Sequence, residues 1–225
     1  MKFENTEVWG FKHALRGMRN PMESWSKSDS REVNIDSCLM GKDGEYKDSP
    51  ISFYRLGEND LSLAQRLIKA GGEHRKFLRQ IFVSVDITAP LFWWKEADTY
   101  KVGTVSNSTS TMHKLASTPI TLECFENGDF DETAVNFSVE QLLKSLDELR
   151  LKYLSTKDKR YWKEVIRWLP ESWLQTRTVT MNYENVLNMY HQRKNHRLSE
   201  WHKFCEWVLT LPYAGEFFIR PFEEK

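Results

Sequence analysis

The stretch that decides the fold runs from Leu169 to Trp207 and reads LPESWLQTRTVTMNYENVLNMYHQRKNHRLSEWHKFCEW. Its β-prone residues 178–180 are followed by apolar side chains at helical spacing, namely Val186, Leu187 and Tyr190. A second apolar series at helical spacing begins after Ser199 and ends before Pro212. The stretch therefore predicts two helices in direct succession, preceded at residues 178–180 by a strand or by an extended entry to the first helix.

The first of these helices carries two polar side chains of interest. Asn182 lies near its start and Arg193 near its end, eleven residues apart. Because that separation is close to three turns of about 3.6 residues each, the two side chains share one face of the helix. An arginine fork suits a pyrimidine carbonyl edge or a phosphate. The alternative is a solvated cluster of cations at a helix end, comprising His191, Arg193, Lys194, His196 and Arg197.

Upstream of this stretch the sequence predicts a helix and then a strand. We expect Asp60 to cap the helix and Gly71 with Gly72 to end it, because the apolar residues between them recur at helical spacing. Alternating apolar residues from Ile81 to Ile87 predict the strand, which Pro90 closes.

The residues after this strand lose any clear period. Trp93 and Trp94 are assigned to the core, because adjacent strand residues face opposite sides and cannot both line one pocket. The polar run 106–111 predicts a solvated loop.

Two further helices are expected before Leu169. Ser138 and Gln141 have the spacing of a capping box at the start of a long apolar-periodic segment. A shorter helix through Trp162 is expected to end at Pro170, because proline disfavours the helical conformation of the preceding residue.

Composition restricts the class of protein. With 225 residues, 40% hydrophobic and 28% charged, the chain is predicted to form a single domain, residues 1–225. Lysine plus arginine equals aspartate plus glutamate at 32 each, which disfavours nucleic acid or an anionic membrane as a partner.

Membrane and metal roles are also disfavoured. The longest largely apolar run, Ile87 to Trp94, is far shorter than the roughly 20 residues of a membrane span, and no signal pattern is present, so we expect a cytoplasmic protein. Cys38, Cys124 and Cys205 lack the spacing of a zinc or redox site, so we expect free thiols and no metal.

The order and spacing of residues 165–209 resemble the nucleotide-binding half of flavin-dependent thymidylate synthases. In those enzymes an Asn reaches the flavin, and an Arg eleven residues later holds and polarises the uracil of dUMP. Asn182 and Arg193 stand at that spacing, with Pro170 twelve residues before Asn182. The resemblance implies an α/β (α+β) domain of helices around a mixed sheet, assembled as a homotetramer with flavin sites between subunits.

A second region of resemblance runs from about Leu63 to Leu115. There the family carries an Arg-His-Arg signature and then an Asn-Glu-x-Ser-x-Arg-Tyr motif. Aligned without gaps from Pro90, the signature falls on residues 99–101, which are Thr-Tyr-Lys, and the second motif on residues 106–112. A slip of one residue would place Asn107 and Ser110 on the family's Asn and Ser.

The resemblance implies a role for each matching residue. Arg193 would be the catalytic residue that polarises the pyrimidine, and Asn182 would face the flavin. Lys101 would replace a signature arginine at a phosphate. The other implied contacts are Gln80 and Tyr100 with the cofactor, and Asn107, Thr109, Ser110 and Arg167, next to a lost family arginine, with the substrate.

The implied activity is reductive methylation of dUMP to dTMP with FAD, NADPH and methylenetetrahydrofolate, without a protein nucleophile. Because the Arg-His-Arg signature is not preserved, an alternative is a pyrimidine-nucleotide-binding relative that has lost flavin chemistry. A third possibility is an oligomer with a purely structural role. A catalytic member would need cations from elsewhere in the chain, with Arg16 and Arg19 as candidates.

Overall fold

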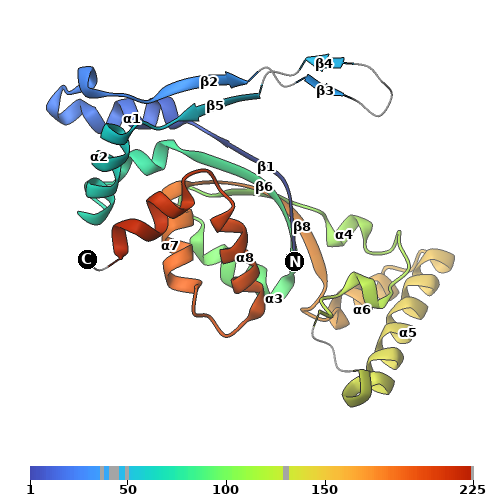
Figure 1. The fold of residues 1–225 in the computed structure, drawn as a ribbon. Coiled ribbons are helices and arrows are strands. Elements are labelled where there is room, and N and C mark those ends of the chain that lie inside the picture. The colour runs from blue at the N-terminus through green and yellow to red at the C-terminus, as the bar shows by residue number, and fades with distance from the viewer. Residues whose placement is uncertain (36–37, 41–45, 49–50, 129–131, 224–225) are drawn as a thin grey trace. The chain divides into compact units, whose positions relative to one another are not determined.

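The computed structural model describes residues 1–35, 38–40, 46–48, 51–128 and 132–223 (Figure 1). The chain divides into two compact units, each assembled from three separate segments. Unit 1 comprises Met1–Glu7, Ser84–Met181 and His196–Lys203, and unit 2 comprises Val8–Val83, Asn182–Asn195 and Phe204–Lys225.

Strands and helices are interspersed along the chain. The strands are β1 (Lys2–Trp9), β2 (Arg31–Ile35), β3 (Cys38–Met40), β4 (Tyr46–Asp48), β5 (Ile51–Arg55), β6 (Phe82–Pro90), β7 (Val105–Ser108) and β8 (Leu174–Asn182). The α-helices are α1 (Phe11–Arg19), α2 (Glu58–Lys69), α3 (Leu91–Ala97), α4 (Thr111–Lys114), α5 (Glu132–Thr156), α6 (Lys159–Trp168), α7 (Tyr183–Arg193) and α8 (Ser199–Leu209). Short turns include η3 (Lys76–Gln80) and the π-helix η6 (Gly215–Ile219).

The main sheet has four strands in the order β1-β6-β8-β7. The pairing of β7 with β8 is antiparallel, with Val105 opposite Thr180 and Ser108 opposite Arg177. Hydrogen bonds between the side chains of β6 and β8 run from Thr88–Thr176 to Ser84–Thr180, so residue numbers rise on one strand as they fall on the other. This pairing is therefore antiparallel too.

The two faces of β6 differ in polarity, as its alternating sequence predicts. Val83, Val85, Ile87 and Ala89 are buried, because every second side chain of a strand points to the same face. Asp86, on the other face, accepts hydrogen bonds from Thr178 Oγ1 at 2.5 Å and Asn5 Nδ2 at 2.8 Å. A polar face of the sheet thus lies back to back with the core.

The predicted class, helices around a sheet, is confirmed. The strand closed by Pro90, the helix ended before Pro170 and the succession β8, α7 and α8 are all observed. The helix α2 ends before Gly71, which takes a φ of 106°, a left-handed value that favours glycine.

Two predicted helix caps are wrong. The N-cap of α2 is Gly57, and Asp60 is a fully buried residue of the first turn. The carboxylate of Asp29 takes over the capping role, accepting from Asn59 N at 2.9 Å and from Asp60 N at 3.1 Å. The helix α5 begins at Glu132, so Ser138 lies inside it and does not form a capping box.

Trp93 and Trp94 are buried, as predicted, but in a helix. Both belong to α3, with 1% and 3% of their surface exposed, and their rings meet edge to face at 4.8 Å. The core assignment is confirmed, whereas the reason given for it, opposite faces of a strand, is wrong.

The polar run 106–111 is not a simple loop. Its first three residues belong to the exposed strand β7, and Thr111 begins α4. Polar side chains are compatible with an edge strand whose faces both meet solvent, so polarity alone misassigned this segment. In the described part of the chain, no helix combines the length and the apolar character that crossing a membrane requires.

Candidate functional site

Asn182 joins β8 to α7. It is the N-cap of the helix, with an extended backbone, and its Oδ1 accepts a hydrogen bond from Asn185 N at 3.0 Å. The strand-to-helix junction is fixed further by Tyr183 N, which donates to the carbonyl oxygen of Ile81 at 2.9 Å. With Oδ1 occupied, the group that Asn182 can offer a ligand is the donor Nδ2.

Arg193 is the last residue of α7 and is half-buried. Eleven residues at a rise of about 1.5 Å each place it roughly 16 Å from Asn182 along the helix. The two side chains therefore serve different ligands, or distant parts of one ligand, and do not grip a single ring together.

The first turn of α7 holds an ion pair that the sequence did not indicate. Arg75 Nε donates to Glu184 Oε1 at 3.0 Å, and Arg75 Nη2 donates to Asn188 Oδ1 at 3.1 Å. The other carboxylate oxygen, Glu184 Oε2, is buried and has no hydrogen-bond partner. We call Arg75, Glu184 and Asn188 the α7 polar cluster.

Gln80 lies at the end of η3, beside α1. Its side-chain oxygen is 2.7 Å from the position that a Cβ on Gly17 would take. Its backbone carbonyl oxygen is 2.1 Å from the position that a Cβ on Gly10 would take. Gly10 also has a φ of 99°, so a side chain is excluded there by both space and backbone conformation. Gln80 therefore packs against the glycines of the α1 segment.

Tyr100 and Lys101 belong to unit 1 and differ in their surroundings. Tyr100 is half-buried, and its ring meets that of Trp201 edge to face at 6.1 Å. Lys101 is exposed. An exposed ammonium group can bind a phosphate. Most lysines are exposed on protein surfaces, however, so exposure by itself does not indicate a site.

The predicted substrate segment is attached to β8. Asn107 stands opposite Thr178 in the pairing of β7 with β8. The backbone N–H of Thr109 donates to Thr176 O at 2.9 Å, and Gln175 Nε2 donates to Thr109 O at 2.9 Å. Both backbone groups of Thr109 are thus held by the sheet, which leaves its exposed side chain toward solvent.

Ser110 directly precedes α4, and Arg167 lies on α6. The carbonyl oxygen of Ser110 accepts from Lys114 N at 3.1 Å, which starts α4. Arg167 is on α6, half-exposed, and forms an ion pair with Glu164 one turn earlier. Residues three apart on a helix surface are neighbours, so this pair is expected. It does not bring Arg167 close to any other predicted residue.

The structure sorts the predicted residues by unit. Unit 2 holds Gln80, Asn182 and Arg193, whereas unit 1 holds Tyr100, Lys101, Asn107, Thr109, Ser110 and Arg167. Within unit 1, Asn107 and Thr109 are both held against β8.

Arg177 is a cation of unit 1 that the sequence reasoning missed. Its guanidinium lies 4.2 Å from the ring centre of Trp94, donates to Gln175 Oε1 at 3.0 Å and pairs with Asp98 Oδ1 at 2.7 Å. Its ion pair with Asp98 places a guanidinium, with its charge balanced, directly before the signature residues 99–101. The alternating pattern of β8 could have identified Arg177, because it puts this residue on the same face of the strand as the buried Val179 and Met181.

The predicted basic cluster is divided between the two units, with His191, Arg193 and Lys194 in unit 2 and His196 and Arg197 in unit 1. His191 is half-buried and its Nε2 lies 2.8 Å from Phe218 O, while His196 Nε2 lies 3.3 Å from Glu96 Oε2. Burial lowers the pKa of His191, and the charges of Lys194 and Arg75 lower it further against the effect of the Phe218 hydrogen bond.

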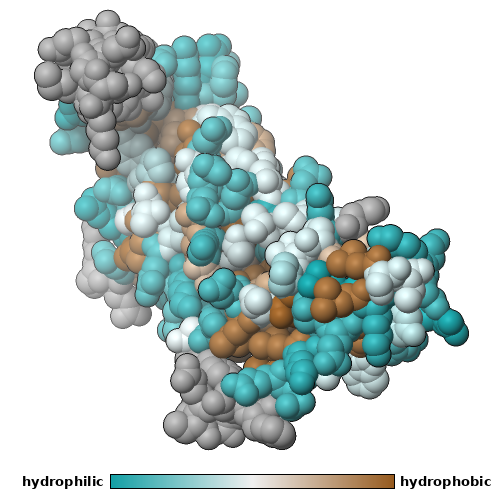
Figure 2. Space-filling model, turned by 90° about the vertical axis from the view of Figure 1, so that its right-hand side faces the viewer, coloured by the Kyte–Doolittle hydropathy of each residue, from teal (hydrophilic) through white to brown (hydrophobic). Residues whose placement is uncertain are grey.

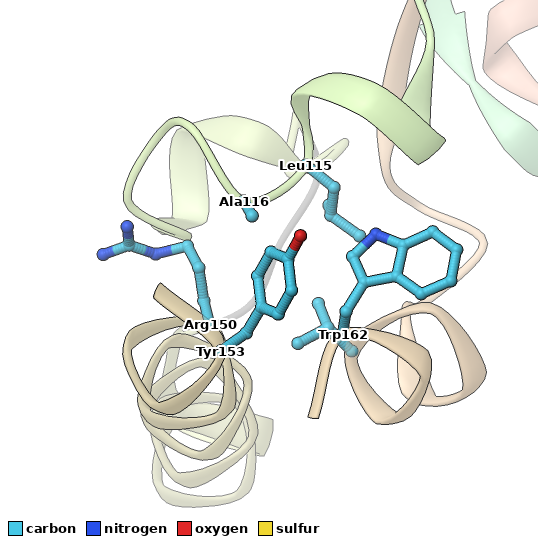
Figure 3. A pocket seen from close by; sticks show the side chains of 6 residues that line it. Leu115, Ala116, Arg150, Tyr153 and Trp162 are labelled. Atoms are coloured by element: carbon cyan, nitrogen blue, oxygen red, sulfur yellow. The ribbon is translucent and has the colours of Figure 1, made fainter. Parts of the chain in front are cut away.

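A small gap lies between α5, α6 and the end of α4 (Figure 3). It encloses about 170 Å³, part of it open to solvent, against the several hundred that ligand pockets provide. Tyr153 points toward Leu115 and Ala116, and the Arg150 guanidinium is turned away, donating to Asp147 Oδ1 at 2.6 Å. The gap therefore reads as loose packing in a small secondary core, not as a ligand site.

No family model matches the sequence, and no curated protein matches it. Solved structures do. The flavin-dependent thymidylate synthase ThyX from Helicobacter pylori, complexed with FAD and dUMP, superimposes with a TM-score of 0.67 and 14% identity over 98% of both chains. A second structure of that enzyme, also with FAD and dUMP, gives a TM-score of 0.65 and 16% identity over 98% of both chains.

This chain has the thymidylate synthase ThyX fold. At this level of identity the likeness concerns the fold, and the individual residues must be judged on their own surroundings. The first turn of α7 carries the buried carboxylate of Glu184, which is paired with Arg75. The charge of this pair is balanced, so the pair provides no net attraction for the pyrophosphate of FAD.

Arg19, a candidate replacement cation, is committed elsewhere. It is 4% exposed, and its Nε donates to Asp60 Oδ1 at 2.5 Å within the core of unit 2. Arg16 is exposed. Among the described residues, no three His, Cys, Asp or Glu side chains are grouped to hold a metal ion, and Cys124 and Cys205 are free thiols.

Proposed function

We propose that this chain binds a pyrimidine nucleotide, with dUMP as the first candidate, and acts as a flavin-dependent thymidylate synthase. The reaction would be reductive methylation of dUMP to dTMP with FAD, NADPH and methylenetetrahydrofolate. The observation that supports it most is α7, which carries Asn182 and Arg193 at its two ends in a fold whose solved examples hold FAD and dUMP.

Each residue has a proposed role that follows from the resemblance to the thymidylate synthases. Arg193 would hold and polarise the pyrimidine, and the Nδ2 of Asn182 would donate to the flavin. Asn107, Thr109, Ser110 and Arg167 would contact the nucleotide. Lys101 would meet a phosphate, while Tyr100 and Gln80 would line the cofactor. Bound FAD would supply the redox chemistry.

The test begins with flavin binding. The purified protein should show flavin absorbance or take up FAD on titration, and NADPH should bleach the bound flavin. Formation of dTMP from dUMP and methylenetetrahydrofolate would then establish the reaction. If dUMP binds while FAD at high micromolar concentration does not, the thymidylate synthase proposal fails.

A second candidate is a pyrimidine-nucleotide-binding protein without flavin chemistry. The α7 polar cluster favours it, because the carboxylate of Glu184 lies in the first turn of α7, two residues after Asn182. In that case Arg193 keeps its role toward the pyrimidine and FAD binds to no part of the protein.

We also propose that residues 1–225 act as one domain of a homotetramer. Several large hydrophobic side chains are exposed, among them Trp168 at 63%, Val105 at 67% and Trp9 at 45%. Figure 2 shows hydrophobic surface as brown patches between hydrophilic areas. Contacts between subunits commonly cover such side chains.

Light scattering coupled to size exclusion should therefore give about four chain masses. The single chain has a mass of 26.7 kDa. A monomer at micromolar concentration would contradict the shared-site arrangement, and a dimer would require each site to be completed by two chains.

A further inference from the structure

Two arginines face each other in the small sheet of unit 2 that β2 and β5 form (Figure 1). Arg31 begins β2 and Arg55 ends β5, and the two residues are direct partners in the antiparallel register. Side chains of such partners point to the same face of the sheet and lie close together, so like charges at these positions destabilise the pairing of the strands. The facing guanidinium groups therefore need an explanation.

The protein itself does not neutralise this pair of cations. Both side chains are exposed, and within the described part of the chain neither guanidinium forms an ion pair or a hydrogen bond. The nearby carboxylate of Asp29 is engaged elsewhere, since its two oxygens accept from Asn59 N at 2.9 Å and from Asp60 N at 3.1 Å. The donors of both arginines are thus available to a group from outside the protein.

The two arginines also line a cavity. It encloses about 530 Å³, part of it open to solvent, and its other lining residues are Asp29, Leu56, Gly57 and Glu58. This volume lies within the range of roughly 300–1,000 Å³ that is typical of sites for small ligands. Glu58 is exposed and belongs to the first turn of α2. An anion in the cavity would therefore meet two free cations and one free carboxylate.

The chemistry of the pair indicates which anion fits. A guanidinium presents a planar fork of N–H donors that matches the oxygens of a phosphate. Two forks on directly opposed residues can bind one tetrahedral oxyanion together, and the bound anion then removes the repulsion between them. We propose that Arg31 and Arg55 bind a phosphate group in this cavity, either as inorganic phosphate or as part of a phosphate monoester. This site lies apart from the residues assigned to dUMP and FAD.

The experiment titrates the full chain with inorganic phosphate, and sodium chloride of equal ionic strength serves as the reference. Calorimetry gives the affinity, and the midpoint of thermal unfolding gives the stabilisation. The variants are Arg31→Gln and Arg55→Gln, which keep most of the side-chain stem, and Glu58→Gln. The matched control is Arg66→Gln, which removes an exposed arginine in the last turn of α2 within the same unit.

Phosphate should raise the unfolding midpoint of the parent above that in chloride, because a ligand of the folded state stabilises it. Each arginine variant should bind phosphate about tenfold more weakly or less, as expected for a lost charge-assisted hydrogen bond. Glu58→Gln should bind phosphate more tightly, because it removes a like charge, and Arg66→Gln should match the parent.

A second readout separates binding from a purely structural role. Without phosphate, Arg31→Gln and Arg55→Gln should unfold at or above the midpoint of the parent, because each relieves the repulsion between facing cations. Arginines that merely support the sheet would give lower midpoints in both variants and an unchanged affinity for phosphate. That result would overturn the inference.

Titrations with dUMP and deoxyuridine distinguish the two sources of the phosphate group. If the arginine variants bind dUMP as weakly as they bind phosphate while deoxyuridine is unaffected, the site holds the phosphate of the nucleotide. If only the affinity for inorganic phosphate falls, the site takes free phosphate or another ester, and the inference stands. A parent that phosphate does not stabilise beyond chloride would contradict it. Formation of dTMP tests the proposed function independently of all these outcomes.

Discussion

Replacement of Arg19 by alanine should lower the free energy of unfolding by about 3–5 kcal/mol, because it leaves the carboxylate of Asp60 buried without its cation. Asp60 is fully buried. It accepts hydrogen bonds from Arg19 Nε at 2.5 Å, from Ser28 Oγ at 2.7 Å and from Ser30 N at 3.1 Å. Equilibrium urea unfolding of parent and variant would measure the difference.

The control is Arg160→Ala, which removes an ion pair to Asp158 whose arginine is 88% exposed. Its unfolding midpoint should stay close to that of the parent, since solvent screens such pairs. Equal midpoints for Arg19→Ala and Arg160→Ala would contradict the assigned role of the buried pair.

The same pair gives a pH dependence with a definite sign. Burial raises the pKa of Asp60, but hydrogen bonds from Ser30, Ser28 and Arg19 outweigh it and lower the pKa below its usual value. A lowered pKa means that the folded state holds the proton less tightly than the unfolded state, for which the pKa is about 3.9. The contribution of Asp60 is therefore present above about pH 4 and is lost as the pH falls through its folded pKa.

Replacement of Arg193 by alanine should weaken dUMP binding by about 1.5–3 kcal/mol, the magnitude expected for a hydrogen bond from a charged donor. Thermal stability should change little, because Arg193 is at the last turn of α7 and is partly exposed. Calorimetric titration with dUMP would measure the effect.

The matched control is Lys194→Ala, the exposed cation that follows in sequence. It should bind dUMP as the parent does, because a general attraction between cations and phosphate is not the proposed interaction. An equal loss of dUMP affinity in both variants would show that Arg193 acts only as one of several solvated cations. An unchanged affinity in Arg193→Ala would show that Arg193 does not contact the nucleotide.

Local patterns predicted the elements that depend on local chemistry. The alternation from Ile81 to Ile87 identified β6, and the helical spacing around Val186 identified α7 with Asn182 at its start. Pro170 ended α6 as expected. In each case the residues that determine the element lie within one or two turns of each other, so the sequence alone contains the information.

Predictions failed where the partner is distant in sequence. Asp60 looks like an N-cap until Asp29, 31 residues earlier, takes that role. The ion pair of Arg75 with Glu184 joins residues 109 apart. Arg177 is held by Asp98, 79 residues away. Composition and spacing carry no record of these pairs, and they are the contacts that set the charge of the candidate site.

The interleaving of the two units has a consequence for synthesis on the ribosome. Unit 2 needs α7 and the segment from Phe204 onward, so its core stays incomplete until the last part of the chain has emerged. The hydrogen bond from Leu56 N to the Tyr213 hydroxyl, at 3.0 Å, closes a loop of 157 residues. Formation of such distant contacts is slow. Residues 8–83 therefore remain without their partners in unit 2 until residues 182–195 and those from Phe204 onward have been synthesised.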